Sequence, residues 1–127
     1  MNDPVSILVV DDNPPMVQTL QDILRVKGYA VHAAHSGAEA LEILQRQKVD
    51  ILLTDVVMPD MDGVALYRQV KESHPRLVTF LMTAYSADEL IRQGMAEGIK
   101  TVLTKPLDLN LFLALVQAVD MAYFHRP

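Results

Sequence analysis

Four charged residues directly follow short apolar runs in this chain, and their types and positions suggest chemistry. Three are carboxylates and one is an ammonium: Asp11, Asp12, Asp55 and Lys105. The apolar runs before them are residues 7–10, 51–54 and 101–104. Three acids held close together repel one another unless a cation joins them, and ligation by oxygen alone favours Mg²⁺, with Mn²⁺ as an alternative. The residues therefore suggest a divalent-metal site beside a lysine.

The elements that would position these residues alternate along the chain. Short continuous apolar runs separated by helical patterns are typical of buried parallel strands. We expect strands at residues 5–10, 30–33, 49–54, 77–82 and 100–103, and helices at about 14–27, 37–46, 63–72, 87–97 and 107–124. Strict alternation with short connections predicts an α/β fold with a doubly wound parallel sheet. In such sheets the ligand site lies beyond the carboxyl ends of the strands, where the four charges fall.

Helix-capping residues support these boundaries. Asn13 is a suitable N-cap, and two prolines after it are tolerated in the first turn. Ser36 with Glu39 three residues later forms a capping-box pattern, and Ser86 with Glu89 repeats it. Each pair predicts the start of a helix.

Length, composition and charge limit the possible classes of protein. The 127 residues, 50% hydrophobic and 21% charged, predict one domain over 1–127 with a core of about 5–122. The net charge of −5 argues against direct nonspecific binding to nucleic acid or anionic membranes. The chain has no cysteine, which excludes disulfides and zinc–thiolate sites. Its first residues lack a signal-peptide pattern and polar residues interrupt the apolar stretch 107–124, so we expect a cytoplasmic protein without a membrane segment.

Four segments carry a resemblance to a known family. They are Asp11-Asp12-Asn13 after the first apolar run, Asp-Val-Val-Met-Pro-Asp-Met-Asp-Gly at 55–63, Met82-Thr83-Ala84, and Lys105-Pro106. One alone would be a weak signal, but four in order at the ends of expected strands are specific. Over about residues 5–119 the chain resembles the receiver domain of bacterial two-component response regulators. The resemblance implies a flavodoxin-like (βα)5 fold whose five-stranded sheet has the order 2-1-3-4-5.

The resemblance implies a metal site and a phosphoacceptor. Asp55 would attack a phosphohistidine on a partner kinase, and its carboxylate would also contact the metal. Asp12 would bind Mg²⁺ directly, Asp11 mainly through a water, and Val57 through its backbone carbonyl. A carboxylate is a sufficient nucleophile for phosphoryl transfer, in which alignment and charge neutralisation do most of the catalysis.

The resemblance also implies which residues hold the phosphoryl group. Thr83 would donate its hydroxyl, helped by the Ala84 amide. Lys105 would pair with Asp55 before modification and with a phosphoryl oxygen afterwards. The peptide bond that precedes Pro106 would be cis, as it is in the family.

Some positions depart from the family pattern. Many receivers carry Tyr or Phe three residues before the lysine of the fifth strand, and this chain has Val102, which has no ring to rotate on activation. Val57 and Tyr85, two residues beyond Asp55 and Thr83, offer no acid or amide that could orient an attacking water. We therefore expect a weaker aromatic coupling and slow dephosphorylation.

The last helix is apolar beyond one stripe. Its expected core face is Leu109, Phe112, Val116, Val119 and Tyr123. A second apolar sector contains Leu111, Leu115, Ala118 and Ala122. This sector is either a wide buried face or a partner surface. Receivers commonly dimerise through the fourth helix, fifth strand and fifth helix, so a homodimer through this surface is one reading.

The function that these observations favour is a phosphorylation-dependent signalling switch rather than an enzyme with an external substrate. Its partners would be a sensor histidine kinase or phosphotransfer protein and an effector protein or a C-terminal output domain. One rival, a haloacid-dehalogenase-like phosphatase, would need a D-x-D-x-T run that residues 11–15 lack. Another, a flavodoxin-like nucleotide binder, would need a phosphate-cradling loop in place of the acidic one. The four histidines, His32, His35, His74 and His125, show no metal-like grouping and are expected at the surface.

Overall fold

Five parallel strands form one sheet in the order β2-β1-β3-β4-β5, so the expected flavodoxin-like α/β fold is confirmed. The structure is a computed structural model that describes residues 4–84 and 88–124. The strands are β1 (Ser6–Val10), β2 (Ala30–Ala34), β3 (Ile51–Asp55), β4 (Val78–Thr83) and β5 (Thr101–Thr104).

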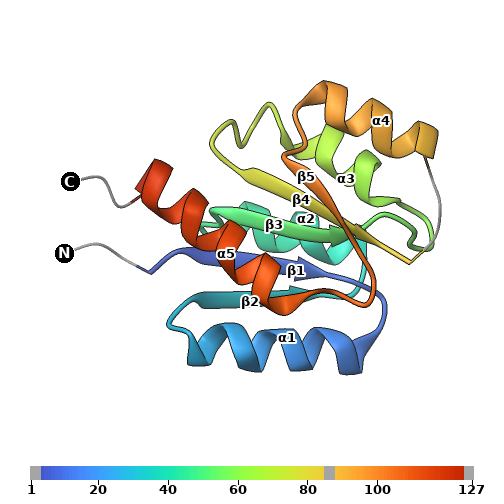
Figure 1. Ribbon diagram of the computed structural model, residues 1–127. Coiled ribbons are helices and arrows are strands. Elements are labelled where there is room, and N and C mark those ends of the chain that lie inside the picture. Colours follow the sequence, from blue (N-terminus) through green and yellow to red (C-terminus); the bar gives the residue numbers. More distant parts are fainter. Residues whose placement is uncertain (1–3, 85–87, 125–127) are drawn as a thin grey trace.

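Helices cover both faces of the sheet. They are α1 (Pro14–Val26), α2 (Gly37–Arg46), α3 (Gly63–Val70), α4 (Asp88–Glu97) and α5 (Leu109–Val119), which continues into a π-helical turn, η1 (Asp120–Phe124). Figure 1 shows α1 and α5 on the near face of the sheet and α2 and α3 behind it, with α4 next to α3. Within the described residues, none of these helices combines the length and apolarity that crossing a bilayer requires.

The side chains of β1 explain why the strands are continuously apolar. Ile7 and Val9 pack into the cluster beneath α1 and α5, whereas Leu8 and Val10 pack into the cluster beneath α2 and α3. All four are completely buried because helices cover both faces of the sheet. The sheet is therefore a rigid support for whatever follows the strand ends.

The capping residues act as the sequence predicts where the structure describes them. The Asn13 side chain accepts the N–H of Met16, and Ser36 accepts that of Glu39. Two further caps were not predicted: Asp62 starts α3 and Asp108 starts α5. The predicted cap at position 86 lies outside the described residues.

The predicted strand starts were early by one or two residues. The expected third, fourth and fifth strands began at 49, 77 and 100, whereas β3, β4 and β5 begin at Ile51, Val78 and Thr101. Val49 is buried and Leu77 is half-buried in the core, although neither belongs to a strand. Their hydrophobic side chains therefore reflect packing in the core rather than hydrogen bonding within the sheet. The expected third helix also ran too long, since α3 ends at Val70.

The last helix differs most from its prediction. Asp108 accepts the N–H of Leu111, so α5 begins at Leu109 rather than at 107. The α-helix then changes to a π-helical turn at Asp120, which shifts the phase of later side chains. Tyr123, which lies in this π-helical turn, was predicted to face the core, but it is 48% exposed.

Candidate functional site

The candidate site is a cleft at the carboxyl ends of the strands, which lie on the right in Figure 1. The cleft has a volume of about 620 Å³ and is lined by Asp11, Asp12, Asn13, Asp55, Val57, Met58, Pro59, Ala84 and Lys105. The loops after β1, β3, β4 and β5 all contribute to it. The sheet therefore brings together the charged residues that the sequence singled out.

Lys105 links two of the three carboxylates. Its Nζ donates to Asp11 Oδ2 at 2.5 Å and to Asp55 Oδ2 at 3.0 Å. Burial by itself lowers the pKa of Lys105, but its hydrogen bonds to Asp11 and Asp55 outweigh this effect and raise the pKa. Lys105 is therefore a firmly held cation at the centre of the acidic cluster.

Asp11 and Asp12 are adjacent in sequence but have different surroundings. The Asp11 side chain is only 1% exposed, and it accepts the backbone N–H of Asn13 as well as the Lys105 ammonium. Asp12 is exposed at the mouth of the cleft. The contribution of the Asn13 amide was not predicted, because the sequence indicated this residue only as a helix cap.

Asp55 is the last residue of β3 and is buried at the base of the cleft. Burial is the largest effect on its carboxyl group and raises its pKa. The hydrogen bond from Lys105 acts in the opposite direction, while the charge of Asp11 raises the pKa further. The backbone N–H of Val57 also donates to Asp55 Oδ1, at 3.3 Å. The Lys105 ammonium and the Val57 N–H thus stabilise the ionised form of Asp55, which burial disfavours.

The β3–α3 loop approaches the backbone of Asp55 closely. The N–H of Gly63 donates to the carbonyl of Val56 at 2.9 Å. A Cβ atom at Gly63 would lie only 2.3 Å from the carbonyl oxygen of Asp55. Glycine is required here for space, and it allows the loop to fold tightly beside the cleft.

The three aspartates form a group that could bind one metal ion. Asp11, Asp12 and Asp55 can each offer a carboxylate oxygen, with all three oxygens within 4.8 Å of one another. An all-oxygen donor set of carboxylates suits Mg²⁺, Mn²⁺ or Ca²⁺ rather than a softer metal. The residues therefore fit the expected divalent cation.

The residues that the sequence suggests for phosphoryl binding lie at the ends of the neighbouring strands. Thr83 ends β4 and is buried, and its carbonyl accepts the backbone N–H of Lys105 at 2.9 Å. Ala84 follows at the rim of the cleft, and the Lys105–Pro106 peptide bond is cis. Val102 on β5 is half-buried against the cluster between the sheet and α4. Position 85 lies outside the described residues.

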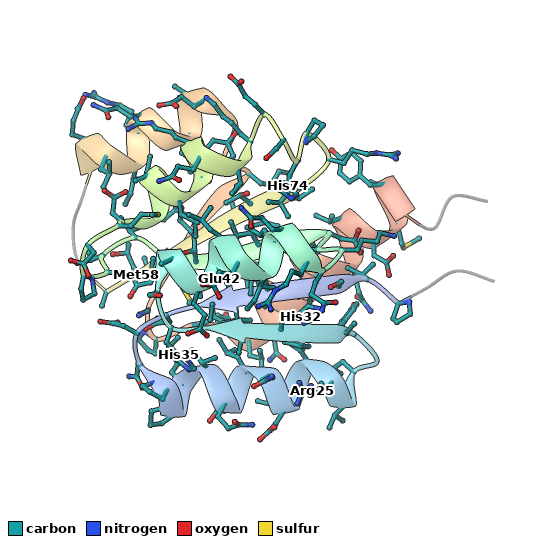
Figure 2. All side chains as sticks on the ribbon, turned by 180° about the vertical axis from the view of Figure 1, so that it is seen from behind. Arg25, His32, His35, Glu42, Met58 and His74 are labelled. Carbon is teal, nitrogen blue, oxygen red and sulfur yellow. The ribbon has the colours of Figure 1, made fainter. Side chains whose placement is uncertain are left out.

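Among the described residues, no histidine belongs to the acidic cluster. Figure 2 shows His32 on β2, His35 just after it and His74 beyond α3. His35 is exposed as predicted, but His32 and His74 are half-buried. The His74 ring forms hydrogen bonds with the Leu44 carbonyl and the Ser73 hydroxyl, so it is a structural link rather than a free surface group. His125 lies outside the described residues.

Comparison with known proteins identifies the family. Residues 7–117 match the model of the response regulator receiver domain. The transcriptional regulatory protein GlrR of Escherichia coli is 36% identical over 119 residues, which cover 94% of this chain and 26% of GlrR. The chain thus spans about a quarter of the length of this curated relative.

Solved structures agree with this match. A response regulator receiver protein from Pseudomonas putida superposes with a TM-score of 0.88 at 28% identity, covering 93% of this chain and 99% of that one. A response regulator from Burkholderia pseudomallei, solved with a phosphorylated aspartic acid, calcium ion and citrate, gives a TM-score of 0.80 at 26% identity, covering 93% and 74%. Receiver domains are phosphorylation-activated signalling modules rather than conventional enzymes. The strand order, the acidic cleft and the family match together show that this chain belongs to the response regulator receiver domain family.

Proposed function

We propose that this chain is a signalling switch in which Asp55 accepts a phosphoryl group from a histidine kinase or a phosphotransfer protein. The observation that carries the proposal is the Asp55 carboxylate, which lies at the base of the acidic cleft between the Val57 amide and the Lys105 ammonium. An Asp55 oxygen would form a bond to phosphorus while the bond between phosphorus and the donor imidazole nitrogen breaks. The electron pair of that bond returns to the imidazole.

The neighbouring residues would stabilise the charge that this transfer moves. Asp11, Asp12, Asp55 and the Val57 carbonyl would hold Mg²⁺, or Mn²⁺, which when bound neutralises phosphoryl oxygens. Lys105 would exchange its hydrogen bond to Asp55 for one to a phosphoryl oxygen. The Thr83 hydroxyl and the Ala84 amide would bind the other oxygens. The phosphoaspartate and calcium ion of the Burkholderia pseudomallei structure support this chemistry in a similar fold.

A groove beside the cleft supports docking of the phosphodonor. It has a volume of about 680 Å³ and runs between α1 and the β5–α5 connection. Its lining is mostly apolar, from Pro15, Met16, Leu20, Ile23, Pro106, Leu107 and Leu109. Ala84 and Lys105 belong to both the groove and the cleft. An amphipathic helix in this groove would bring a phosphohistidine to the mouth of the cleft.

The output would act through the surface formed by α4, β5 and α5. Phosphorylation would change this surface and thereby the binding of an effector protein, of a C-terminal output domain or of a second copy of the chain. The curated relatives are about four times longer than the matched region, which supports an attached output domain. Leu111 is 47% exposed on α5, and Leu115 is half-buried beside it, so part of the second apolar sector is available to a partner.

Phosphorylation by acetyl phosphate tests the proposal directly. Intact-protein mass spectrometry should show a gain of one phosphoryl group only when Mg²⁺ is present, since three carboxylates repel the donor without it. Asp55→Asn should abolish the gain. Asp22→Asn, which removes an exposed carboxylate of α1, is the matched control and should react like the wild type. A gain that survives Asp55→Asn would reject the assignment.

Light scattering with and without beryllofluoride tests the homodimer. Dimerisation through α5 should follow beryllofluoride addition in the wild type and be lost in Leu111→Glu. Val26→Glu introduces the same charge at an apolar residue on α1 that is 85% exposed, and it should leave dimerisation unchanged. If the wild type stays monomeric in both states, the homodimer reading is wrong.

A further inference from the structure

One end of α4 is bound to α3 by a cluster of polar contacts around Glu97. Both Glu97 carboxylate oxygens accept from Arg68 Nε at 3.0 Å, and Oε2 also accepts from Arg68 Nη2 at 2.7 Å. Lys71 Nζ donates to the same carboxylate at 3.2 Å. Hydrogen bonds from these two side chains lower the pKa of Glu97 to about 2, so it is ionised at any physiological pH. We call these contacts, with the Tyr67 bond described next, the Glu97 anchor.

Tyr67 adds a bond to the backbone at the same point. Its hydroxyl donates to the Glu97 carbonyl at 2.7 Å. It occupies the space above Gly98, where a Cβ atom would lie 2.4 Å from the phenol oxygen. Gly98 has a φ of +120°, so glycine is needed both for its conformation and for this close approach. The carbonyl at the end of α4 is therefore satisfied by α3 rather than by water.

Next to the Glu97 anchor, the backbone of α4 at Gly94 packs closely against apolar side chains. A Cβ atom at Gly94 would lie 2.6 Å from Ile99 Cδ1 and 3.2 Å from Val64 Cγ2. Gly94 is buried although it lies on a surface helix. The backbone of α4 thus lies directly against side chains of α3 and of the segment before β5. Rotation or sliding at this end would require all these contacts to change together.

The other end of α4 is held differently. Glu89 pairs with Arg92 and accepts from Gln93, both on the same helix. Gln93 in turn accepts from Arg68 Nη2 at 3.1 Å, so the contacts of Arg68 reach the middle of α4 but not residues 89–92. Leu90 and Ile91 are only half-buried against the cluster that includes Val102. This end also follows Thr83 and Ala84, the proposed phosphoryl-binding residues, within a few positions. Any movement caused by phosphorylation would therefore enter α4 at its amino-terminal end, where the described side chains of residues 89–92 form no hydrogen bond to another helix.

We propose that the Glu97 anchor is a fixed pivot that confines the phosphorylation-dependent change to residues 88–92 and their contacts with β5. Because this inference rests on the proposed function, its test has a part that does not require phosphorylation. The anchor divides α4 into a mobile amino-terminal half and a carboxyl-terminal half that stays on α3. A partner that distinguishes the two states would then contact the amino-terminal half.

Residue-resolved amide hydrogen exchange by NMR on the unliganded protein tests the anchor itself. Glu97→Gln and Arg68→Met should each speed exchange at residues 94–99 by about threefold to tenfold, because local opening of this end becomes easier. Glu42→Gln is the matched control, since Glu42 is an exposed carboxylate whose ion pair among the described residues lies within α2, with Arg46 at 3.9 Å. It should leave residues 94–99 unchanged. Equal exchange at 94–99 in all four proteins would overturn the proposal.

Addition of beryllofluoride then tests whether the structural change is confined to residues 88–92. In the wild type it should change amide shifts and exchange at residues 89–92 and leave 94–99 at their unliganded values, whereas in Arg68→Met the changes should extend through 94–99. Equal changes at both ends of α4 in the wild type would refute the pivot. If beryllofluoride perturbs neither Asp55 nor Thr83, the proposed function is wrong, and the unliganded exchange data still decide the anchor.

Discussion

Lys105 lies closer to Asp11 than to the candidate phosphoacceptor: its Nζ is 2.5 Å from Asp11 Oδ2 and 3.0 Å from Asp55 Oδ2. The ammonium thus neutralises two of the three carboxylates that a divalent cation would also favour. If Mg²⁺ binds in this cleft as proposed, it would compete with this lysine for the Asp11 and Asp55 carboxylates. The affinity of the cleft for a metal should therefore depend on the hydrogen bonds that Lys105 makes.

Lys105→Met should bind Mg²⁺ about tenfold more tightly than the wild type, because a positive charge beside the metal and a competing donor are both removed. Calorimetric titration with Mg²⁺ measures the affinity. Lys100→Met removes an exposed lysine just before β5 and should have little effect. Weaker or unchanged binding in Lys105→Met would mean that the lysine does not compete with the metal.

Asp12→Ala should lose much more Mg²⁺ affinity than Asp11→Ala. The Asp11 carboxylate already accepts from Lys105 and the Asn13 amide, whereas Asp12 is exposed in the cleft. We expect a loss above about tenfold for Asp12→Ala, since a direct carboxylate ligand is removed. Without metal, Asp12→Ala should be at least as stable as the wild type, because repulsion is relieved. Equal losses in the two variants would reject the distinction.

Gly63→Ala should destabilise the domain by about 2–3 kcal/mol, since the new methyl group overlaps the Asp55 carbonyl and forces the loop or β3 to move. Chemical denaturation measures the change. Gly28→Ala is the comparison: its φ of +98° is strained for alanine, but nothing lies within 4 Å of the new Cβ atom. It should cost only about 1 kcal/mol. A smaller effect at Gly63 than at Gly28 would contradict the close packing.

Dephosphorylation of Asp55 should be slow in the wild type and about tenfold faster in Val57→Asn, because an amide at this position could orient an attacking water. Val57 is 46% exposed in the cleft, so the substitution should not disturb the core. Loss of the phosphoryl group over time can be followed by intact mass. The proposal fails if hydrolysis is fast in the wild type or slower still in Val57→Asn.

The Glu97 anchor should give stability that depends on pH in acid. Hydrogen bonds from Arg68 and then Lys71 lower the pKa of Glu97 from 4.5 to about 2 in the folded protein. Because the folded pKa is the lower one, this stabilisation is fully present above pH 4.5 and is lost as the pH falls from about 4.5 to about 2. In urea unfolding, the free-energy difference between the wild type and Glu97→Gln should therefore shrink across this window. A constant difference would show that the carboxylate is not specifically paired.

The sequence by itself predicted a parallel sheet and the residues that meet at its edge, whereas the strand order followed from the resemblance to receiver domains. The continuous apolar runs before Asp11, Asp55 and Lys105 are buried on both faces, and parallel strands necessarily end at one edge. Asn13 and Ser36 were readable as caps because a cap bonds only to a backbone group a few residues away. These features depend on short-range geometry, which residue types encode directly.

Only the tertiary structure decided how distant side chains are paired. The bond from Lys105 to Asp11 spans 94 positions, and that from Arg68 to Glu97 spans 29. The local pattern placed Lys105 and Asp11 at one edge of the sheet but did not show that they bond to each other. It did not distinguish Arg68 and Glu97 from other surface charges, because their pairing is fixed by how α3 and α4 pack. The exposure of Tyr123 was also not predicted: the residue lies in the π-helical turn that begins at Asp120, where the α-helical period used for the prediction no longer applies.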